Sequence, residues 1–180
     1  MAEHRHVAFL RAINVGNRRV TNDELAAAFT QSGMADVETY QAAGNVIFTT
    51  EDTEPPRAQI EEGLEKVLGY EVPIFARTAA EATAIAAREL FTVEQLDAST
   101  GKEQVAFFEQ PPDNDRREKT LELATDTDLL AFGERELHWL PAGGFRDSQL
   151  DLDAVEELCG LHTVRTKGTV ERIARKYFGA

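Results

Sequence analysis

Hydrophobic and polar positions alternate along the first half of the chain in a way that predicts six elements. Strands are predicted at 6–13, 37–41, 45–50 and 72–77, and helices at 21–33 and 55–69. Thr21 followed by Glu24 is the capping-box pattern that begins a helix, and Gly33 is a typical residue at a helix end. The resulting order, β-α-β-β-α-β, predicts a ferredoxin-like sandwich, in which two helices cover one face of an antiparallel sheet.

The second half of the chain predicts a further α+β unit. An alanine-rich helix is expected at 79–90, a connector at 92–102 and an exposed loop leading into a short helix at 111–119. Further strands are predicted at 104–109, 128–132, 136–140 and 162–165, and further helices at 151–159 and 168–178. We therefore predict an α+β protein with two ferredoxin-like subdomains, residues 1–92 with the connecting helix and residues 93–180.

Composition places the chain among globular proteins and disfavours several partners. It has 180 residues, of which 42% are hydrophobic and 28% charged, and its net charge is −13. No segment is apolar enough for a membrane span, the N-terminus lacks the layout of a signal peptide, and Cys159 is the single cysteine. These features predict a cytoplasmic location. The acidic balance argues against a general affinity for nucleic acids or anionic membranes.

The charge is unevenly distributed. The segment before residue 20 and the segment after residue 162 each have an excess of arginine and lysine, whereas the region between them is strongly acidic. One interpretation is a solvated acidic surface with a basic last helix of no functional importance. The other is that the two basic ends come together and form a positively charged patch.

Four short motifs resemble those of DUF1697, a family of uncharacterised bacterial proteins. LRAINVGN at 10–17 resembles the family's LRGINVGG, and TYQAAGNVIF at 39–48 resembles TYxQSGNVxF. PAGGFRDSQL at 141–150 resembles a PxG motif followed by serine and leucine, and TVRTKGT at 163–169 resembles TxRNxxT. The resemblance covers nearly the whole chain in the same order. It implies two ferredoxin-like subdomains and no established activity.

Several positions depart from these family motifs. Alanine replaces a family glycine at Ala12, asparagine replaces another at Asn17, and threonine replaces the asparagine after the arginine at Thr166. Ala42 and Ala43 stand where the family has glutamine and serine. If the lost amide and hydroxyl served chemistry in the family, this chain would not perform that chemistry in the same way.

The candidate ligand-binding residues are Arg11, Asn14, Gly16, Asn45, Arg165, Lys167 and Thr169, of which all but Lys167 match the family motifs. A glycine and hydroxyls between two cations at a helix start leave N–H groups that attract anions. We expect the loop 14–19 and the helix start 165–169 to lie together. The alternative for each residue is structural: a buried ion pair for Arg11, turn hydrogen bonds for Asn14 and Asn45, positive φ for Gly16, and an ordinary N-cap at Thr166 or Thr169.

The other reactive residue types point to no reaction. His4 and His6 alternate on a strand but lack further metal ligands, so no metal is predicted. His138 is interpreted as a packed core residue, and His162 is the histidine to test as an acid or base. Cys159 is interpreted as a structural thiol. No signature of a nucleophile, zinc site or phosphate-binding loop occurs, so the pattern leaves both catalysis and any cofactor open.

The leading hypothesis from the sequence is therefore a cytoplasmic protein that binds a small anionic molecule at a basic cleft. Two alternatives stay open. Ferredoxin-like sheets serve RNA recognition in other proteins, although the aromatic pattern of that class is missing and the net charge is adverse. The chain could also act as a protein-interaction module whose basic patch docks an acidic partner or a second copy.

Overall fold

A computed structural model describes residues 3–14 and 16–180 of the chain. Val15, inside the first motif and the predicted loop 14–19, lies outside the described residues, as do Met1 and Ala2 at the beginning of the predicted first subdomain. Contacts divide the chain into two compact units, one formed by Met1–Thr83 with Ile173–Ala180 and the other by Ala84–Arg172. The boundary between 92 and 93 inferred from the sequence stays a prediction.

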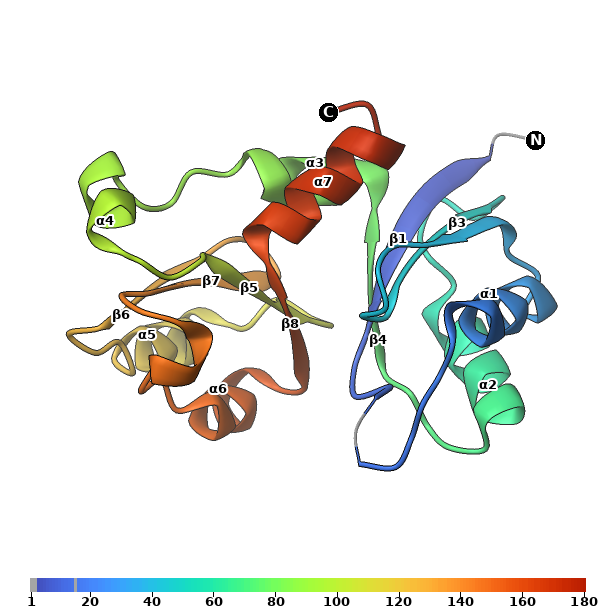
Figure 1. The fold of residues 1–180 in the computed structure, drawn as a ribbon, viewed down its shortest axis with the longest axis horizontal. Helices are drawn as coiled ribbons and strands as arrows, with labels where there is room; N and C mark the ends of the chain where they lie inside the picture. The colour runs from blue at the N-terminus through green and yellow to red at the C-terminus, as the bar shows by residue number, and fades with distance from the viewer. Residues whose placement is uncertain (1–2, 15) are drawn as a thin grey trace. The chain divides into compact units, whose positions relative to one another are not determined.

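The first unit has the predicted β-α-β-β-α-β order. Its elements are β1 (His4–Leu10), α1 (Asn22–Gln31), β2 (Ala35–Thr39), β3 (Asn45–Thr50), α2 (Arg57–Leu68) and β4 (Ile74–Thr78). The four strands form an antiparallel sheet in the order β2-β3-β1-β4, with α1 and α2 on one face (Figure 1). Its core between sheet and helices includes Ala8, Leu10, Leu25, Phe29, Phe48, Ile60, Leu64 and Ile74.

The second unit repeats this arrangement, which confirms the predicted fold class. Its elements are β5 (Gln104–Phe108), α5 (Asn114–Leu121), β6 (Asp128–Phe132), β7 (Glu136–Pro141), the short 3-10 helix η1 (Phe145–Asp147), α6 (Leu152–Cys159) and β8 (His162–Thr166). The antiparallel strand order is β6-β7-β5-β8, with α5 and α6 on one face (Figure 1). Their shared core includes Ala106, Phe108, Leu137, Trp139 and Val155.

Three helices lie outside the two repeats: α3 (Ala79–Ala87), α4 (Val93–Ala98) and α7 (Lys167–Tyr177). The predicted apolar stripe of the last helix is confirmed, because Val170, Ile173, Ala174 and Tyr177 are buried. The end of α7 packs within the first unit, where the Tyr177 ring meets the ring of Tyr40 edge-on at 6.2 Å.

Two local expectations were wrong. The first strand ends at Leu10 rather than Ile13, because Ala12 has a φ of 55° that no strand residue adopts. The connector at 92–102 contains α4, which a capping box of Thr92 and Gln95 begins. Arg11 therefore lies just beyond β1 and not within it, and its backbone N–H donates to the Pro73 oxygen at 3.1 Å.

One buried carboxylate organises the edge of the second sheet. Asp128, at the start of β6, is fully buried and accepts hydrogen bonds from one neighbouring strand, β7, and from two loops. The donors are the side chains of Thr125, Thr127, Trp139 and Ser148 and the backbone N–H of Gln149. The serine of the third motif thus has a structural role, since it ties the 145–150 segment to the sheet.

Replacing Asp128 with asparagine should lower the free energy of unfolding by about 2–4 kcal/mol, because hydrogen bonds to a buried charge contribute more than neutral ones. Burial alone would raise the pKa of Asp128, but the bonds from Ser148, Trp139, Gln149 and Thr125 outweigh it and lower the pKa below its usual value. This stabilisation is therefore present above about pH 4 and is lost as the pH falls through the lowered pKa. Urea unfolding of both proteins from pH 7 to pH 2.5 measures the difference, which should narrow below pH 4. An unchanged difference across this range would contradict the role of the ionised carboxylate.

Candidate functional site

The second sheet has two faces of different chemistry. The face toward α5 and α6 is apolar, whereas the opposite face carries polar and charged residues next to Val105 and Phe107 of the central strand β5. Val105 pairs with His138 of β7 on one side and with Arg165 of β8 on the other. Phe107 pairs with Glu136 and Thr163 in the same way.

Arg165 lies among oxygen acceptors of its own strand. Its Nη1 donates to the Thr163 hydroxyl at 2.9 Å and to the backbone oxygen of Val164 at 2.8 Å. Burial lowers the pKa of Arg165 to about 10, so the guanidinium is still positively charged at neutral pH. The fourth motif therefore places a desolvated positive charge at the strand end from which α7 begins.

The first turn of α7 collects two more cations. The Thr166 hydroxyl accepts the Thr169 N–H at 3.2 Å and caps the helix, so the cap is Thr166 and not Thr169, the other residue that the sequence offered. Arg172 folds back over this turn, where its Nη2 donates to the Thr169 hydroxyl at 3.2 Å. A Cβ atom on Gly168 would lie 3.3 Å from Arg172 Nη1, so the guanidinium rests against the glycine backbone.

Lys167 is anchored by Glu103, the residue before β5. The Lys167 N–H donates to the Glu103 backbone oxygen at 2.9 Å, and its ammonium lies 3.8 Å from the Glu103 carboxylate and 3.8 Å from that of Glu171. Both distances are longer than the usual length of a direct hydrogen bond. The lysine side chain is 13% exposed, so its ammonium is held near the surface by two loosely placed carboxylates.

Glu103 also holds a buried histidine. Its Oε1 lies 2.6 Å from Nδ1 of His138, an imidazole with no solvent exposure. Since an ionised carboxylate only accepts, Nδ1 is the donor. The other ring nitrogen, Nε2, makes no hydrogen bond with the part of the chain that the structure describes, and it lies 3.9 Å from the Glu136 carboxylate. One carboxylate thus joins the buried imidazole to the cationic start of α7.

Glu136 also has a structural role, in the turn between β6 and β7. Its carboxylate accepts the backbone N–H groups of Glu134 and Arg135 and lies 3.4 Å from Arg88 Nη1. The positive charge of Arg88 would repel a metal cation placed between Glu136 and His138. Among residues 3–14 and 16–180, no three His, Cys, Asp or Glu side chains are grouped so that they could hold a metal ion.

The remaining histidines and the cysteine have packing environments. His6 is buried, and burial lowers its pKa although its Nε2 donates a hydrogen bond to the Asp52 backbone oxygen at 3.1 Å. His162, the histidine singled out for acid–base tests, is also buried, with Nδ1 3.8 Å from the Glu156 carboxylate. Burial raises the pKa of the Cys159 thiol, which contacts the Thr120 hydroxyl at 3.1 Å.

The candidate residues of the first unit belong to the first two motifs. Asn14 is exposed and accepts the Val20 N–H at 3.0 Å, and Gly16 has a φ of 64°. Asn45 is buried opposite Phe9, and its amide donates to the Tyr40 oxygen at 3.0 Å. These bonds agree with the turn chemistry that the sequence offered as the alternative to ligand contact.

The structure brings the candidate residues together in two groups. Arg165, Lys167 and Thr169 lie in one group within the second unit, whereas the first motif adjoins the second motif within the first unit, where the Leu10 N–H donates to the Gly44 oxygen at 2.8 Å. A site shared by Arg11 and Arg165 stays a prediction.

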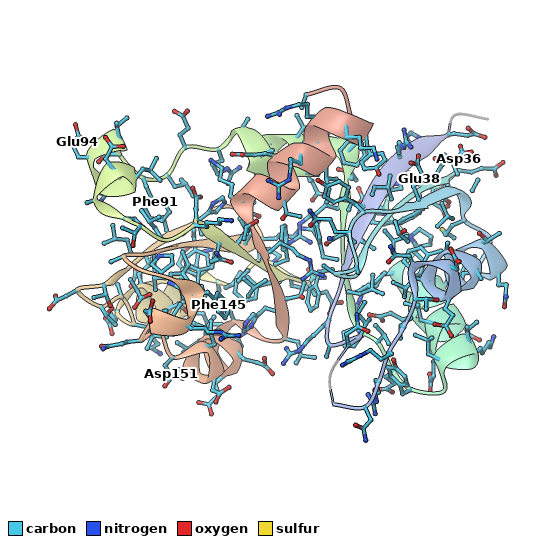
Figure 2. The ribbon with its side chains drawn as sticks, in the orientation of Figure 1. Asp36, Glu38, Phe91, Glu94, Phe145 and Asp151 are labelled. Carbon is cyan, nitrogen blue, oxygen red and sulfur yellow. The ribbon has the colours of Figure 1, made fainter. Side chains whose placement is uncertain are left out.

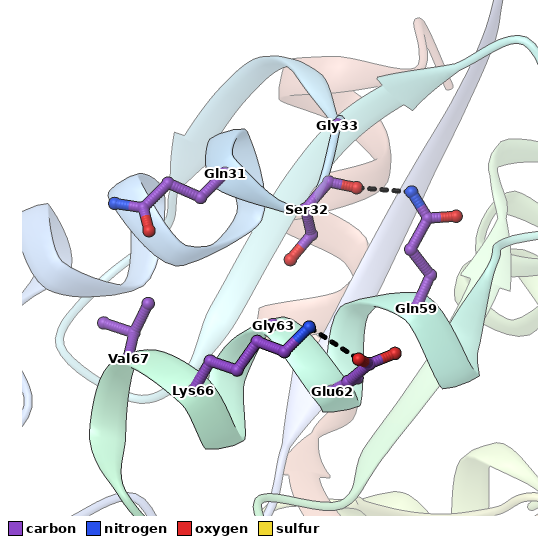
Figure 3. Close-up of a pocket in the computed structure, with 8 residues that line it drawn as sticks. All are labelled: Gln31, Ser32, Gly33, Gln59, Glu62, Gly63, Lys66 and Val67. Atoms are coloured by element: carbon purple, nitrogen blue, oxygen red, sulfur yellow. Dashed lines mark hydrogen bonds and ion pairs between the residues drawn. The ribbon is translucent and has the colours of Figure 1, made fainter.

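A separate pocket of about 360 Å³ lies in the first unit between the end of α1 and α2 (Figure 3). Its polar groups bond one another: the Gln59 amide donates to the Ser32 backbone oxygen, and Lys66 pairs with Glu62. A Cβ atom on Gly63 would lie 1.8 Å from the Ser32 hydroxyl, so the two helices touch at the pocket floor. This pocket is explained by helix packing.

The fold and the motifs define a duplicated α+β protein, and comparison with known proteins agrees. The family described as "Protein of unknown function (DUF1697)" matches residues 4–138, so the chain belongs to the DUF1697 family. It is similar to the structure of the conserved bacterial protein SP0830 from Streptococcus pneumoniae, with a TM-score of 0.69, 22% identity and coverage of 97% of this chain and 98% of that one. That identity supports the fold alone. None of the curated proteins matches.

Sequence reasoning missed Glu103 and Arg172 and gave His138 no polar role. The alternation in ELHWL places Glu136 and His138 on one strand face, which was a readable signal for a polar pair. Nothing in the spacing identified Glu103, because its partners come from β7 and α7, far along the chain.

Replacing Gly44 with alanine should cost about 2–4 kcal/mol of folding stability, because it combines a left-handed φ with a steric conflict. Its φ is 69°, and a Cβ atom there would lie 2.9 Å from Ile13 Cδ1 and 3.1 Å from Leu10 Cβ. Gly69→Ala is the matched control, since its φ is 78° and no atom lies within 4 Å of the added Cβ. Thermal unfolding of both variants should show the larger loss at Gly44, and equal losses would contradict the close approach of the two motifs.

Restoring glycine at Ala12 should stabilise the protein by about 0.5–1 kcal/mol. Ala12 has a φ of 55°, which costs an alanine about 1–2 kcal/mol, whereas the added freedom of glycine in the unfolded chain costs about 0.4–1 kcal/mol. Denaturant unfolding of Ala12→Gly measures the balance. A destabilised variant would show that the family glycine at this position is not required by the backbone.

Proposed function

We propose that the protein binds a small anionic molecule at the start of α7. The observation that carries this proposal is the gathering of Lys167 and Arg172 over the first turn of that helix, beside the partly buried Arg165 of β8. The partial positive charge at a helix N-terminus repels cations, so two cations placed there make the binding of a negatively charged group more favourable.

The backbone adds donors to this arrangement. The first N–H groups of an α-helix have no acceptor inside the helix. Those of Lys167 and Thr169 are bonded to Glu103 and to the Thr166 hydroxyl. Gly168 lies between them, and because it has no side chain the Arg172 guanidinium rests against its backbone. A phosphate or carboxylate there would meet the glycine N–H, the ammonium and the Arg172 guanidinium together.

The carboxylates nearby set how large the net attraction is. The carboxylates of Glu103 and Glu171 flank the Lys167 ammonium, but each lies 3.8 Å from it. Neither carboxylate therefore forms a short hydrogen bond with the ammonium. Glu103 is already engaged with His138 at 2.6 Å. An incoming anion can therefore gain a short bond to Lys167 without first breaking one.

Lys167→Gln should weaken the binding of inorganic phosphate or pyrophosphate by about tenfold or more, because a charge-assisted hydrogen bond contributes about 1.5–3 kcal/mol. Isothermal calorimetry at low ionic strength measures this. Lys119→Gln is the matched control: it removes one positive charge from the same unit, where Lys119 pairs with Asp115 on α5. It should change the affinity less than twofold.

The proposal fails if neither anion binds the wild-type protein, or if Lys119→Gln weakens binding as much as Lys167→Gln. Circular dichroism of each variant establishes that the fold is retained, and Lys167→Arg should keep most of the affinity because it preserves the charge.

A further inference from the structure

A groove in the second unit is lined by α4, by the segment before β6 and by residues of β6 and β7. Figure 1 shows α4 on the opposite side of the sheet from α5 and α6, and Glu94 marks α4 in Figure 2. It has a volume of about 280 Å³. Its floor is formed by Leu129 and Leu140, which are direct cross-strand partners of β6 and β7. Ala98 of α4 and Ala142 after β7 complete the apolar lining.

The wall formed by α4 is held in place from one end. The Ser99 hydroxyl donates to the Pro141 oxygen at 2.5 Å, and the Thr100 N–H donates to the Ala142 oxygen at 2.9 Å. A Cβ atom on Gly101 would lie 2.0 Å from the Gly143 oxygen, so the chain passes in direct contact with the β7 end. The groove is therefore preformed, yet no residue of α4 is buried.

The hydrogen-bonding groups around the groove are largely committed to the protein itself. The Gln95 amide oxygen accepts the Thr92 N–H, and the Ser99 hydroxyl also accepts the Gly101 N–H. The Thr127 hydroxyl donates to Asp128. A ligand that needs several hydrogen bonds would find few partners on this rim.

Two carboxylates give the rim its charge. Glu94 bonds its own backbone N–H and Thr92, which lowers its pKa and keeps it ionised at neutral pH. Asp126, across the groove, makes no hydrogen bond or ion pair with residues 3–14 and 16–180. Lysine and arginine are absent from the described residues that line the groove. An apolar floor under an anionic rim favours a cation with a hydrocarbon body.

We infer that this groove binds a small aliphatic primary amine, with its chain on Leu129 and Leu140 and its ammonium at Asp126 and Glu94. A carboxylate-bearing ligand is disfavoured here by both rim charges. The inference is independent of the anion site at α7, which uses different residues and the opposite ligand charge.

The test is a titration of the protein with n-butyl-, n-pentyl- and n-hexylammonium, followed by amide chemical shifts. Each added methylene should raise the affinity about fourfold until the floor is covered. The shifts should centre on Thr127, Leu129 and Ala142. Hexanoate should not bind, and hexanol should bind more weakly than hexylammonium. Absent shifts, shifts spread over the acidic surface, or equal binding of the alcohol and the amine would overturn the inference.

Variants distinguish amine binding in the groove from nonspecific binding to the acidic surface of the protein. Asp126→Asn should weaken hexylammonium binding about two- to fivefold, as for an exposed ion pair. Asp97→Asn removes the same charge from α4 at a residue outside the groove lining and should leave the affinity unchanged. Ala98→Leu, at an exposed helical position, should fill the groove and abolish binding without unfolding the helix. Equal losses in the two aspartate variants, or full binding by Ala98→Leu, would contradict the proposal.

Discussion

The chemistry of the second unit depends on one constraint: charges placed on the buried face of a sheet have to be paired or hydrogen-bonded. Glu103 meets this constraint for two elements at once, through His138 of β7 and Lys167 of α7. Glu136 meets it with Arg88 and two turn N–H groups. These pairings set the positions of the charged groups, and they therefore also determine where positive charge is not fully neutralised.

The positive charge collects where β8 passes into α7. Arg165 donates along its own strand, Lys167 leans toward Glu103, and Arg172 folds back to Thr169. The net charge of −13 repels anions at long range, but screening limits that repulsion to roughly 10 Å or less at physiological salt. Under the proposed function, the three cations would attract a small anion at short range in spite of the acidic surface around them.

The order of elements and the apolar cores could be predicted from the sequence, because periodicity and capping residues are local signals. Thr21 with Glu24, and the stripe Val170 to Tyr177, are examples that the structure confirms. The Glu103–His138–Lys167 connection could not be predicted, since it joins residues 35 and more positions apart. The helix α4 was missed because it has only six residues and none of them is buried. The left-handed backbone at Ala12 was missed because a glycine, the usual signal for positive φ, is absent there.

Anion binding at the start of α7 can be followed through the chemical shifts of the protein during a phosphate titration. If the anion binds there, we expect saturable shifts centred on the amides of Gly168 and Thr169 and on the Arg172 Nε resonance. Saturable shifts centred elsewhere, or none at these three positions up to millimolar phosphate, would contradict it.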